Sequence, residues 1–188
     1  MEHSIIAQIF FSNVYITYTL INDTYVSVAF CLLPNKQKFT YKSLFELLKK
    51  KCQDLGCNLN PTKIVIDYEL GIHSSVREVF PEANVVGCRF HLAQAWWRKV
   101  QNVGLSSEYK NENSEIGKWL KHIFGLMYLP PSQVGDCFVE DFMPEKPDDH
   151  RVDAFANYLV ETYIEEDSTF PPQIWTKNSP SIYRTTNS

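Results

Sequence analysis

The hydrophobic pattern of the sequence changes its period near residue 40, and this change limits the folds that the chain can adopt. Before it, three runs rich in β-branched and aromatic residues predict strands over 4–11, 14–21 and 25–33. A short polar turn separates the second and third runs, so we expect an antiparallel meander. After the change, apolar residues recur at helical spacing over 40–55 and predict an amphipathic helix.

The helix after the change carries end signals of its own. Thr40 is expected to be its N-cap, and Gly56 falls just past its last apolar residue. The elements that follow are shorter, and they are expected to be a strand over 62–68, a helix over 74–80 and a strand over 84–88. A strand with a continuous apolar run, such as the first of these, is typically buried on both faces. This order predicts an α/β fold with a mixed sheet, in which three antiparallel strands precede parallel ones.

Beyond residue 91 the apolar spacing is helical throughout. The expected helices cover 92–103 and 114–128, a segment that begins near Pro131, and 152–163. Asp148 and Asp149 precede the last of these helices and are expected to cap it. From residue 165 onward no period is sustained, so the tail is expected to be mostly extended.

The overall charge does not favour a protein that binds nucleic acid without help. The formal net charge is -4 at pH 7 and the isoelectric point is near 5.7. A self-sufficient nucleic-acid binder usually shows a basic footprint instead. Any contact with DNA is therefore expected to be local or to be supplied elsewhere.

The cysteines and the hydropathy indicate an intracellular chain that does not enter a membrane. The five cysteines are odd in number and lack CxxC spacing, so we expect reduced thiols. No apolar run reaches the roughly 18 residues that a membrane span needs. Glu2 and His3 stand where a secretory signal would begin with basic residues. We expect a nuclear or cytoplasmic location, no secretion and no membrane partner.

Asp67 is the sharpest single candidate for chemistry. It follows the run Ile64-Val65-Ile66 and so stands at the carboxyl end of a predicted buried strand, where open α/β sheets place their sites. From position alone, a turn or cap role is an equally good interpretation. Phosphoryl transfer with two divalent ions about 4 Å apart needs several carboxylates, so one aspartate cannot build that site.

Cys88 and His91 form a CxxH unit at a predicted junction between a strand and a helix. A thiol and an imidazole can supply half of a zinc site. Because neither a CxxC nor an HxxxH pair accompanies them, we favour a structural role at the start of the helix. The zinc interpretation stays open beside it.

The segment that follows combines aromatic and basic residues, a combination that can stack on bases and contact phosphates. Neighbouring residues of a helix point in different directions, however, so Trp96 is expected in the core. Arg98 and Lys99 are then either solvated charges or DNA contacts, and both interpretations stay open.

Several segments taken together resemble one protein family in their order and spacing. The segments are 25–36, 40–45, Asp67-Tyr68-Glu69, Val79-Phe80-Pro81, 87–99, 119–130, 170–175 and 184–188. They resemble the transposase domain of Mutator-like elements, the MULE family. Because the resemblance spans nearly the whole chain, it is more specific than any single motif.

The resemblance implies a ribonuclease H-like fold with a helical insertion and a DDE-type site that uses two Mg²⁺ or Mn²⁺ ions. Asp67 matches the second catalytic acid and would be a metal ligand, and Cys88 and His91 match the family's CxxH signature. Arg89, Arg98 and Lys99 become candidate DNA contacts. The first acid has no match, and the third is expected beyond the last residue. With one acid of three, the chain is an incomplete enzyme that is not expected to bind metal stably.

The resemblance also implies a division of the chain and a set of functions. Residues 1–104 would be a truncated catalytic core, 105–167 the helical insertion and 168–188 an extended tail that leads to the last catalytic helix. The first hypothesis is a fragment of a DNA transposase, inactive alone, whose intact relatives act on transposon ends. The alternative is a non-catalytic module that binds DNA or protein, and self-association is left open. A zinc-dependent structural protein is the third hypothesis.

Overall fold

The computed structural model of the chain describes residues 13–21 and 24–176. These residues divide into two compact units. The hairpin unit contains the described residues up to 62 together with 69–83, and the helical unit contains 63–68 and the residues from 84 onward. The division into segments at residues 104 and 167 stays a prediction.

The hairpin unit begins with two antiparallel strands, β1 (Asn13–Ile21) and β2 (Thr24–Leu33). They pair from Asn13 opposite Leu33 to Ile21 opposite Thr24, with one shift of register between Thr17 and Tyr18. This confirms an antiparallel arrangement for the second and third predicted strands. The first predicted strand, over 4–11, lies outside the described residues.

Helix α1 (Lys38–Asp54) follows the hairpin. The prediction that Thr40 caps it is wrong, because Gln37 is the last extended residue and the helix begins at Lys38. The Thr40 hydroxyl instead donates to Asn35 Oδ1 at 2.6 Å. At the other end Gly56 has φ +77°, as expected for the glycine just past a helix.

Helix α2 (Leu70–Val79) begins four residues before the predicted start. Its first turn lies against the chain that enters α1, because a Cβ on Gly71 would stand 2.6 Å from Lys36 O. Further along, the Ser75 hydroxyl donates to Lys38 O at 2.8 Å. These close backbone contacts hold the two helices together.

The core of the hairpin unit lies between α1 and α2. Tyr41, Leu44 and Phe45 of α1 are buried, as are Ile72, Val76 and Val79 of α2. The rings of Phe45 and Phe80 meet edge to face, with centroids 5.7 Å apart. Full burial of side chains of this size stabilises a fold by roughly 1.5–3 kcal/mol each.

The helical unit contains the parallel pair β3 (Lys63–Ile66) and β4 (Asn84–Gly87). The described strands therefore form two separate two-stranded sheets. The prediction of one continuous mixed sheet is not met by these residues. In one continuous sheet, a strand of the pair β1–β2 would be joined by hydrogen bonds to a strand of the pair β3–β4, either directly or through a further strand. Residues 13–21 and 24–176 show no such pairing.

The rest of the helical unit is helical, as predicted. Its α-helices are α3 (Arg89–Asn102), α4 (Ser106–Lys110), α5 (Glu115–Ile123), α6 (Pro131–Cys137), α7 (His150–Leu159) and α8 (Pro172–Trp175). Three short helices of other types join them, namely η1 (Phe124–Tyr128), η2 (Phe138–Phe142) and η3 (Val160–Ile164). Two predictions need correction, because α4 was not expected and α8 interrupts the tail that was expected to be extended.

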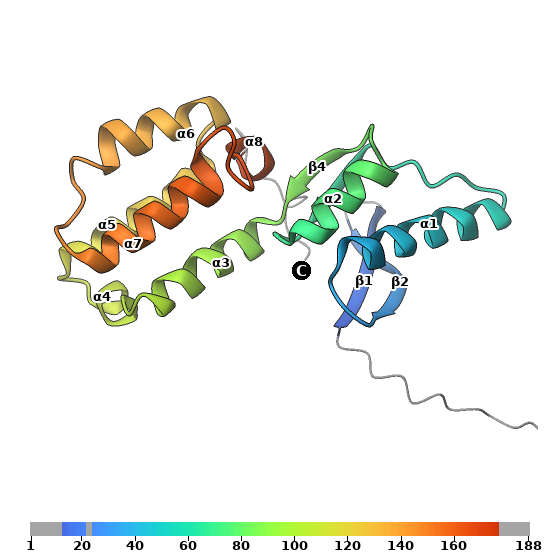
Figure 1. Ribbon diagram of the computed structural model, residues 1–188, viewed down its shortest axis with the longest axis horizontal. Helices are drawn as coiled ribbons and strands as arrows, with labels where there is room; N and C mark the ends of the chain where they lie inside the picture. Colours follow the sequence, from blue (N-terminus) through green and yellow to red (C-terminus); the bar gives the residue numbers. More distant parts are fainter. Residues whose placement is uncertain (1–12, 22–23, 177–188) are drawn as a thin grey trace, which may run out of the picture. The chain divides into compact units, whose positions relative to one another are not determined.

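Buried residues of α3, α5 and α7 share one hydrophobic core in this unit, whose helices are labelled in Figure 1. Trp96 and Trp175 are fully buried, with ring centroids 5.6 Å apart, and Trp96 lies 5.8 Å from Tyr163. The Trp175 indole donates to the carbonyls of Tyr163 and Phe170 at 3.1 and 3.0 Å. The placement of Trp96 in the core confirms that prediction. The aromatic cluster ties α8 and the chain before it to α3.

No helix within residues 13–21 and 24–176 combines the length and the apolar character that crossing a membrane requires.

Candidate functional site at the ends of β3 and β4

Two residues follow the parallel strands at the same edge of their sheet. Ile66 lies opposite Gly87 in the register, so Asp67 and Cys88 come next at the carboxyl ends. The Cys88 N–H donates to Ile66 O at 2.8 Å and extends the pairing by one step. Asp67 thus stands at the edge where α/β sheets carry their sites.

The Asp67 carboxylate meets two groups of the helical unit. Its Oδ1 accepts the Tyr68 N–H at 2.7 Å and lies 3.6 Å from His91 Nδ1. The Asp67 side chain is 42% exposed and the His91 side chain is 26% exposed. A carboxylate oxygen and an imidazole nitrogen therefore face each other beside the strand ends, in side chains that are partly exposed although His91 Nδ1 itself is buried.

The start of helix α3 explains why His91 lies there. Cys88 has an extended backbone and precedes the helix, and its carbonyl accepts the Leu92 N–H at 3.0 Å. His91 therefore falls in the first turn, next to the strand end that carries Asp67. Cys88 itself is fully buried. The two residues of the CxxH unit thus differ in their surroundings. The Cys88 thiol lies in the interior, whereas the His91 imidazole lies beside Asp67.

Among the described residues, no group of three or more His, Cys, Asp or Glu side chains is placed to hold a metal ion. The structure thus offers no third ligand to complete a zinc site around Cys88 and His91. A zinc-dependent role for this pair stays a prediction that metal analysis must test.

Tyr68 is a residue of the site that sequence reasoning missed. Its ring packs edge to face on Phe170 at 5.2 Å and on Tyr163 at 5.9 Å between centroids. Its phenol also fills the space over Gly87, where a Cβ would stand 2.1 Å from the Tyr68 oxygen. Tyr68, which directly follows Asp67, is therefore held against the aromatic core. A glycine at the end of the partner strand was the available signal, because glycine in a strand often marks a close approach.

The aromatic neighbours of the site are themselves strongly desolvated. Burial raises the pKa of Tyr163 far above its usual range, and the hydrogen bond with Tyr158 and the nearby charge of Asp67 act in the same direction. The two phenol oxygens of this pair are 3.2 Å apart. Tyr163 is therefore neutral at all ordinary pH values and serves as a packing residue.

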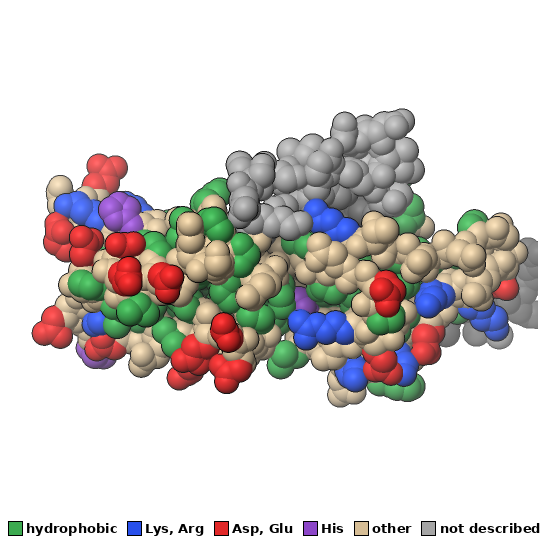
Figure 2. All heavy atoms as spheres, turned by 90° about the horizontal axis from the view of Figure 1, so that it is seen from above, with side chains coloured by type: hydrophobic (Ala, Val, Ile, Leu, Met, Phe, Trp, Pro, Cys, Tyr) green, Lys and Arg blue, Asp and Glu red, His purple; other side chains and the backbone are tan. Residues whose placement is uncertain are grey.

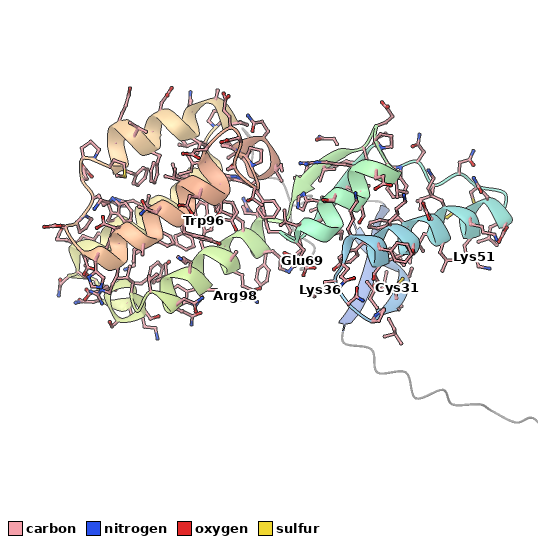
Figure 3. The ribbon with its side chains drawn as sticks, in the orientation of Figure 1. Cys31, Lys36, Lys51, Glu69, Trp96 and Arg98 are labelled. Atoms are coloured by element: carbon pink, nitrogen blue, oxygen red, sulfur yellow. The ribbon has the colours of Figure 1, made fainter. Side chains whose placement is uncertain are left out.

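The three predicted DNA-contact residues lie on α3, and each contacts a neighbour in the helical unit. The Arg89 guanidinium lies over the Tyr128 ring at 5.2 Å, and Lys99 Nζ lies over the Tyr158 ring at 5.0 Å. Arg98 donates to Gln94 Oε1 at 2.7 Å. Trp96 points into the helical unit, whereas Arg98 points away from it (Figure 3). None of these contacts involves Asp67 or His91, so the structure does not join the basic residues to the site.

The surface of the helical unit is strongly acidic. Residues 136–167 carry eleven carboxylates and two basic side chains. Asp and Glu side chains gather over this unit in Figure 2. Among them, Asp149 accepts hydrogen bonds from the Arg151 side chain and backbone, which hold the pKa of its carboxyl well below the usual range. A phosphate backbone would be repelled from this surface.

Comparison with known proteins finds one family. Residues 8–95 match the family model described as the MULE transposase domain. This range includes the hairpin, both helices of the hairpin unit, both parallel strands and the first turns of α3. No curated protein and no solved structure gives a significant match.

Proposed function

We propose that this chain, whose residues 8–95 match the model of the MULE transposase domain, is part of the catalytic core of a Mutator-like DNA transposase. The intact core would cut and join DNA by metal-dependent phosphoryl transfer. The proposal includes a ribonuclease H-like fold, supported by the order of an antiparallel hairpin, a helix and parallel strands along the chain.

The placement of Asp67 is the observation that carries the proposal. Its carboxylate follows β3 at the carboxyl edge of the parallel pair, is oriented by the Tyr68 N–H and remains accessible to solvent. In such a site two divalent ions activate the attacking oxygen and stabilise the leaving oxygen. Asp67 would hold one of the ions, and we propose Mg²⁺ or Mn²⁺ because carboxylate oxygens suit both.

The proposal includes inactivity of the 188-residue chain by itself. A pair of ions needs several carboxylates in fixed positions, and residues 13–21 and 24–176 bring no cluster of three potential ligands together. The chain would therefore bind a single ion weakly. Partner acids from a longer protein would be needed for the chemistry.

A strand-cleavage assay tests this proposal. The chain would be incubated with labelled duplex DNA and either Mg²⁺ or Mn²⁺, with Asp67→Asn as the matched variant. We expect no cleavage above background with either protein. Metal-dependent cleavage that disappears in Asp67→Asn would show that the chain is active alone, and cleavage that survives in the variant would remove Asp67 from the proposal.

A measurement of metal binding tests the site independently of activity. Paramagnetic Mn²⁺ broadens the NMR signals of nearby amides, so we expect selective broadening at Tyr68 and Cys88, with half-saturation at millimolar Mn²⁺. Asp67→Asn should abolish the selectivity. Broadening that is unchanged in this variant would place the metal elsewhere and contradict the proposed site.

A second candidate function is a non-catalytic module that binds DNA, and the charge of the hairpin unit favours it. The described part of this unit has seven basic and five acidic side chains, whereas the described part of the helical unit has nine basic and fifteen acidic ones. Six of the seven basic residues are lysines in or just before α1, namely Lys36, Lys38, Lys42, Lys49, Lys50 and Lys51. This is the local basic surface that an acidic chain would need to contact phosphates.

Several of these lysines are paired with acids. Lys38 Nζ lies 3.0 Å from Glu78, and Lys42 also contacts Glu78, so a single carboxylate is shared by two lysines. This sharing lowers the pKa of the Glu78 carboxyl and raises that of the Lys42 ammonium. Lys42 Nζ also lies 3.9 Å from Glu46 and Lys51 Nζ lies 3.8 Å from Asp54, so the positive charge left along α1 is that of Lys49 and Lys50, which form no ion pair with a described residue.

A further inference from the structure

We propose that His91 is a metal ligand: its Nδ1 and Asp67 Oδ1 together bind one divalent ion and make a site that prefers Mn²⁺ over Mg²⁺. This inference rests on the proposed function for the presence of an ion at Asp67. It adds a residue, a donor atom and a metal preference to the proposed site.

The distance between the two donor atoms is the first argument. Nδ1 and Oδ1 are 3.6 Å apart, which is too long for an N–H···O hydrogen bond. Two adjacent ligands of one ion, each about 2.1 Å from it, are about 3 Å apart. A small rotation of either side chain would bring both atoms within reach of a shared ion.

The hydrogen bonding of His91 is the second argument. Its Nδ1 is buried and forms no hydrogen bond with any described residue. A buried polar atom without a partner is destabilising by about 1–3 kcal/mol, and most such atoms in folded proteins are satisfied. An ion held between Nδ1 and Asp67 would satisfy this nitrogen.

The rigidity of the surroundings is the third argument. His91 is in the first turn of α3, and Asp67 directly follows β3. The Cys88 N–H to Ile66 O hydrogen bond joins these two elements at the site. The Tyr68 N–H in turn fixes the Asp67 carboxylate. With one donor on a helix and the other directly after a strand, hydrogen-bonded neighbours keep the spacing of the two donor atoms, which is what a metal site requires.

The chemistry of the two donors determines the preference. Mg²⁺ prefers oxygen ligands, whereas an imidazole nitrogen favours later first-row metals. Mn²⁺ accepts both carboxylate and imidazole, so it fits the pair better than Mg²⁺. Because the described residues supply two ligands, water would complete the coordination shell and the affinity would be low.

Pulsed electron paramagnetic resonance of Mn²⁺ added to the 188-residue chain tests this inference. An imidazole bound to Mn²⁺ gives a ¹⁴N modulation that carboxylate and water ligands do not give. We expect this modulation in the natural chain and its replacement by a ¹⁵N signal when only the histidines carry ¹⁵N. The isotope experiment needs no substitution and so cannot fail through misfolding.

Variants identify which histidine is bound. His91→Ala should remove the modulation and weaken Mn²⁺ binding at least about tenfold, while the preference for Mn²⁺ over Mg²⁺ shrinks. His122→Ala is the control, because His122 lines a separate pocket of the helical unit, beside Glu140 and Asp141. The modulation should persist in this variant.

The outcomes separate this inference from the proposed function. Mn²⁺ binding that requires Asp67 but shows no ¹⁴N modulation would overturn the role of His91 and leave the proposed site intact. Modulation lost in His122→Ala rather than in His91→Ala would also overturn it. Absence of any Asp67-dependent binding at millimolar Mn²⁺ would remove both the His91 ligand and the metal site of the proposed function.

Discussion

The phenol of Tyr68 lies against the backbone of Gly87, so that a Cβ on residue 87 would stand 2.1 Å from the Tyr68 oxygen. The contact joins the ends of two parallel strands, one of which leads into Asp67. Since the Tyr68 ring also packs on Tyr163 and Phe170, the strand end is fixed to the core of the helical unit.

Gly87→Ala should therefore destabilise the fold. The ring of Tyr68 cannot move aside without leaving its two aromatic partners, so we expect a loss of about 1–3 kcal/mol, as for overpacked cores. Urea-induced unfolding would measure it. Gly135→Ala is the matched control, because α6 leaves open space at that Cβ and alanine favours a helix interior by up to about 1 kcal/mol. Equal stability of the two variants would contradict the contact.

A double-mutant cycle locates the cause of this loss. Removing the ring in Tyr68→Ala also removes the obstacle to a Cβ at residue 87. Gly87→Ala should then cost less in the Tyr68→Ala background than in the natural chain. An unchanged cost would mean that another atom near Gly87 limits the substitution.

The pairing of Asp149 with Arg151 at the start of α7 predicts that stability depends on pH. Asp149 accepts the Arg151 N–H at 2.8 Å and contacts the Arg151 side chain, and its carboxyl has a pKa well below the usual range in the folded chain. A carboxyl whose pKa is lower in the folded chain than in the unfolded chain stabilises the fold at pH values above its unfolded pKa of about 3.9. This contribution is lost as the pH falls toward the folded pKa.

Asp149→Asn isolates this contribution. Asparagine keeps the capping oxygen but not the charge. We expect the natural chain to lose stability relative to the variant as the pH falls below about 5, with little change in their difference between pH 6 and 8. Thermal unfolding at a series of pH values would show it. Parallel curves down to pH 2 would contradict the role of the ionised carboxylate.

A cap on α5 predicts a second effect on stability. The Ser114 side chain accepts the Gly117 N–H at 3.1 Å and donates to Glu108 at 2.6 Å. Ser114→Ala should cost about 1 kcal/mol of unfolding free energy, whereas Ser114→Thr keeps a hydroxyl that can accept and donate and should retain most of the stability. Ser107→Ala, at an exposed position of α4, is the control and should change stability by less than about 0.5 kcal/mol.

The lysines of α1 predict salt-dependent binding to duplex DNA if the second candidate function holds. Each lysine that neutralises a phosphate adds about 0.9 to the steepness of the logarithmic salt dependence. Replacing Lys38, Lys42 and Lys50 by glutamine should therefore weaken binding and lower the slope by up to about 2.7. Fluorescence anisotropy with a labelled duplex at several salt concentrations would measure both.

Two further variants make this prediction specific. Replacing Lys110, Lys118 and Lys121 by glutamine removes the same charge from the helical unit and should leave the slope unchanged. Glu78→Gln removes the acid shared by two lysines of α1 and should strengthen binding, a gain that misfolding cannot produce. Binding that responds equally to both lysine sets would reflect total charge rather than the α1 surface.

The sequence predicted the elements of this chain better than their boundaries. The apolar period located α1, α5 and α7, because a helix face buried against a core must recur every three to four residues. It misplaced the start of α1, since Thr40 has the right chemistry for a cap while the backbone at Gln37 decides where the helix begins. It missed α8, whose four residues are too few to show a period.

The candidate site was predicted in part. The run before Asp67 was enough to place an acid at the end of a strand, although only Ile66 of that strand is buried and the predicted burial on both faces is wrong. The spacing of Cys88 and His91 indicated a junction with a helix. Gly87 at a strand end could signal a close approach, but the sequence did not indicate that Tyr68 is the residue that fills the space over it. That contact depends on two strands separated by a helix, and a pattern along the chain does not report distances across it.

The sequence by itself determined most of the described strands and longer helices and which carboxylate stands at a strand end, because period and residue type act locally. The tertiary structure decided that His91 faces Asp67 and that Cys88 is buried instead. It also decided that the described strands form two separate pairs. These outcomes depend on register and packing, in which residues far apart in sequence compete for the same space, and local preference does not fix the result.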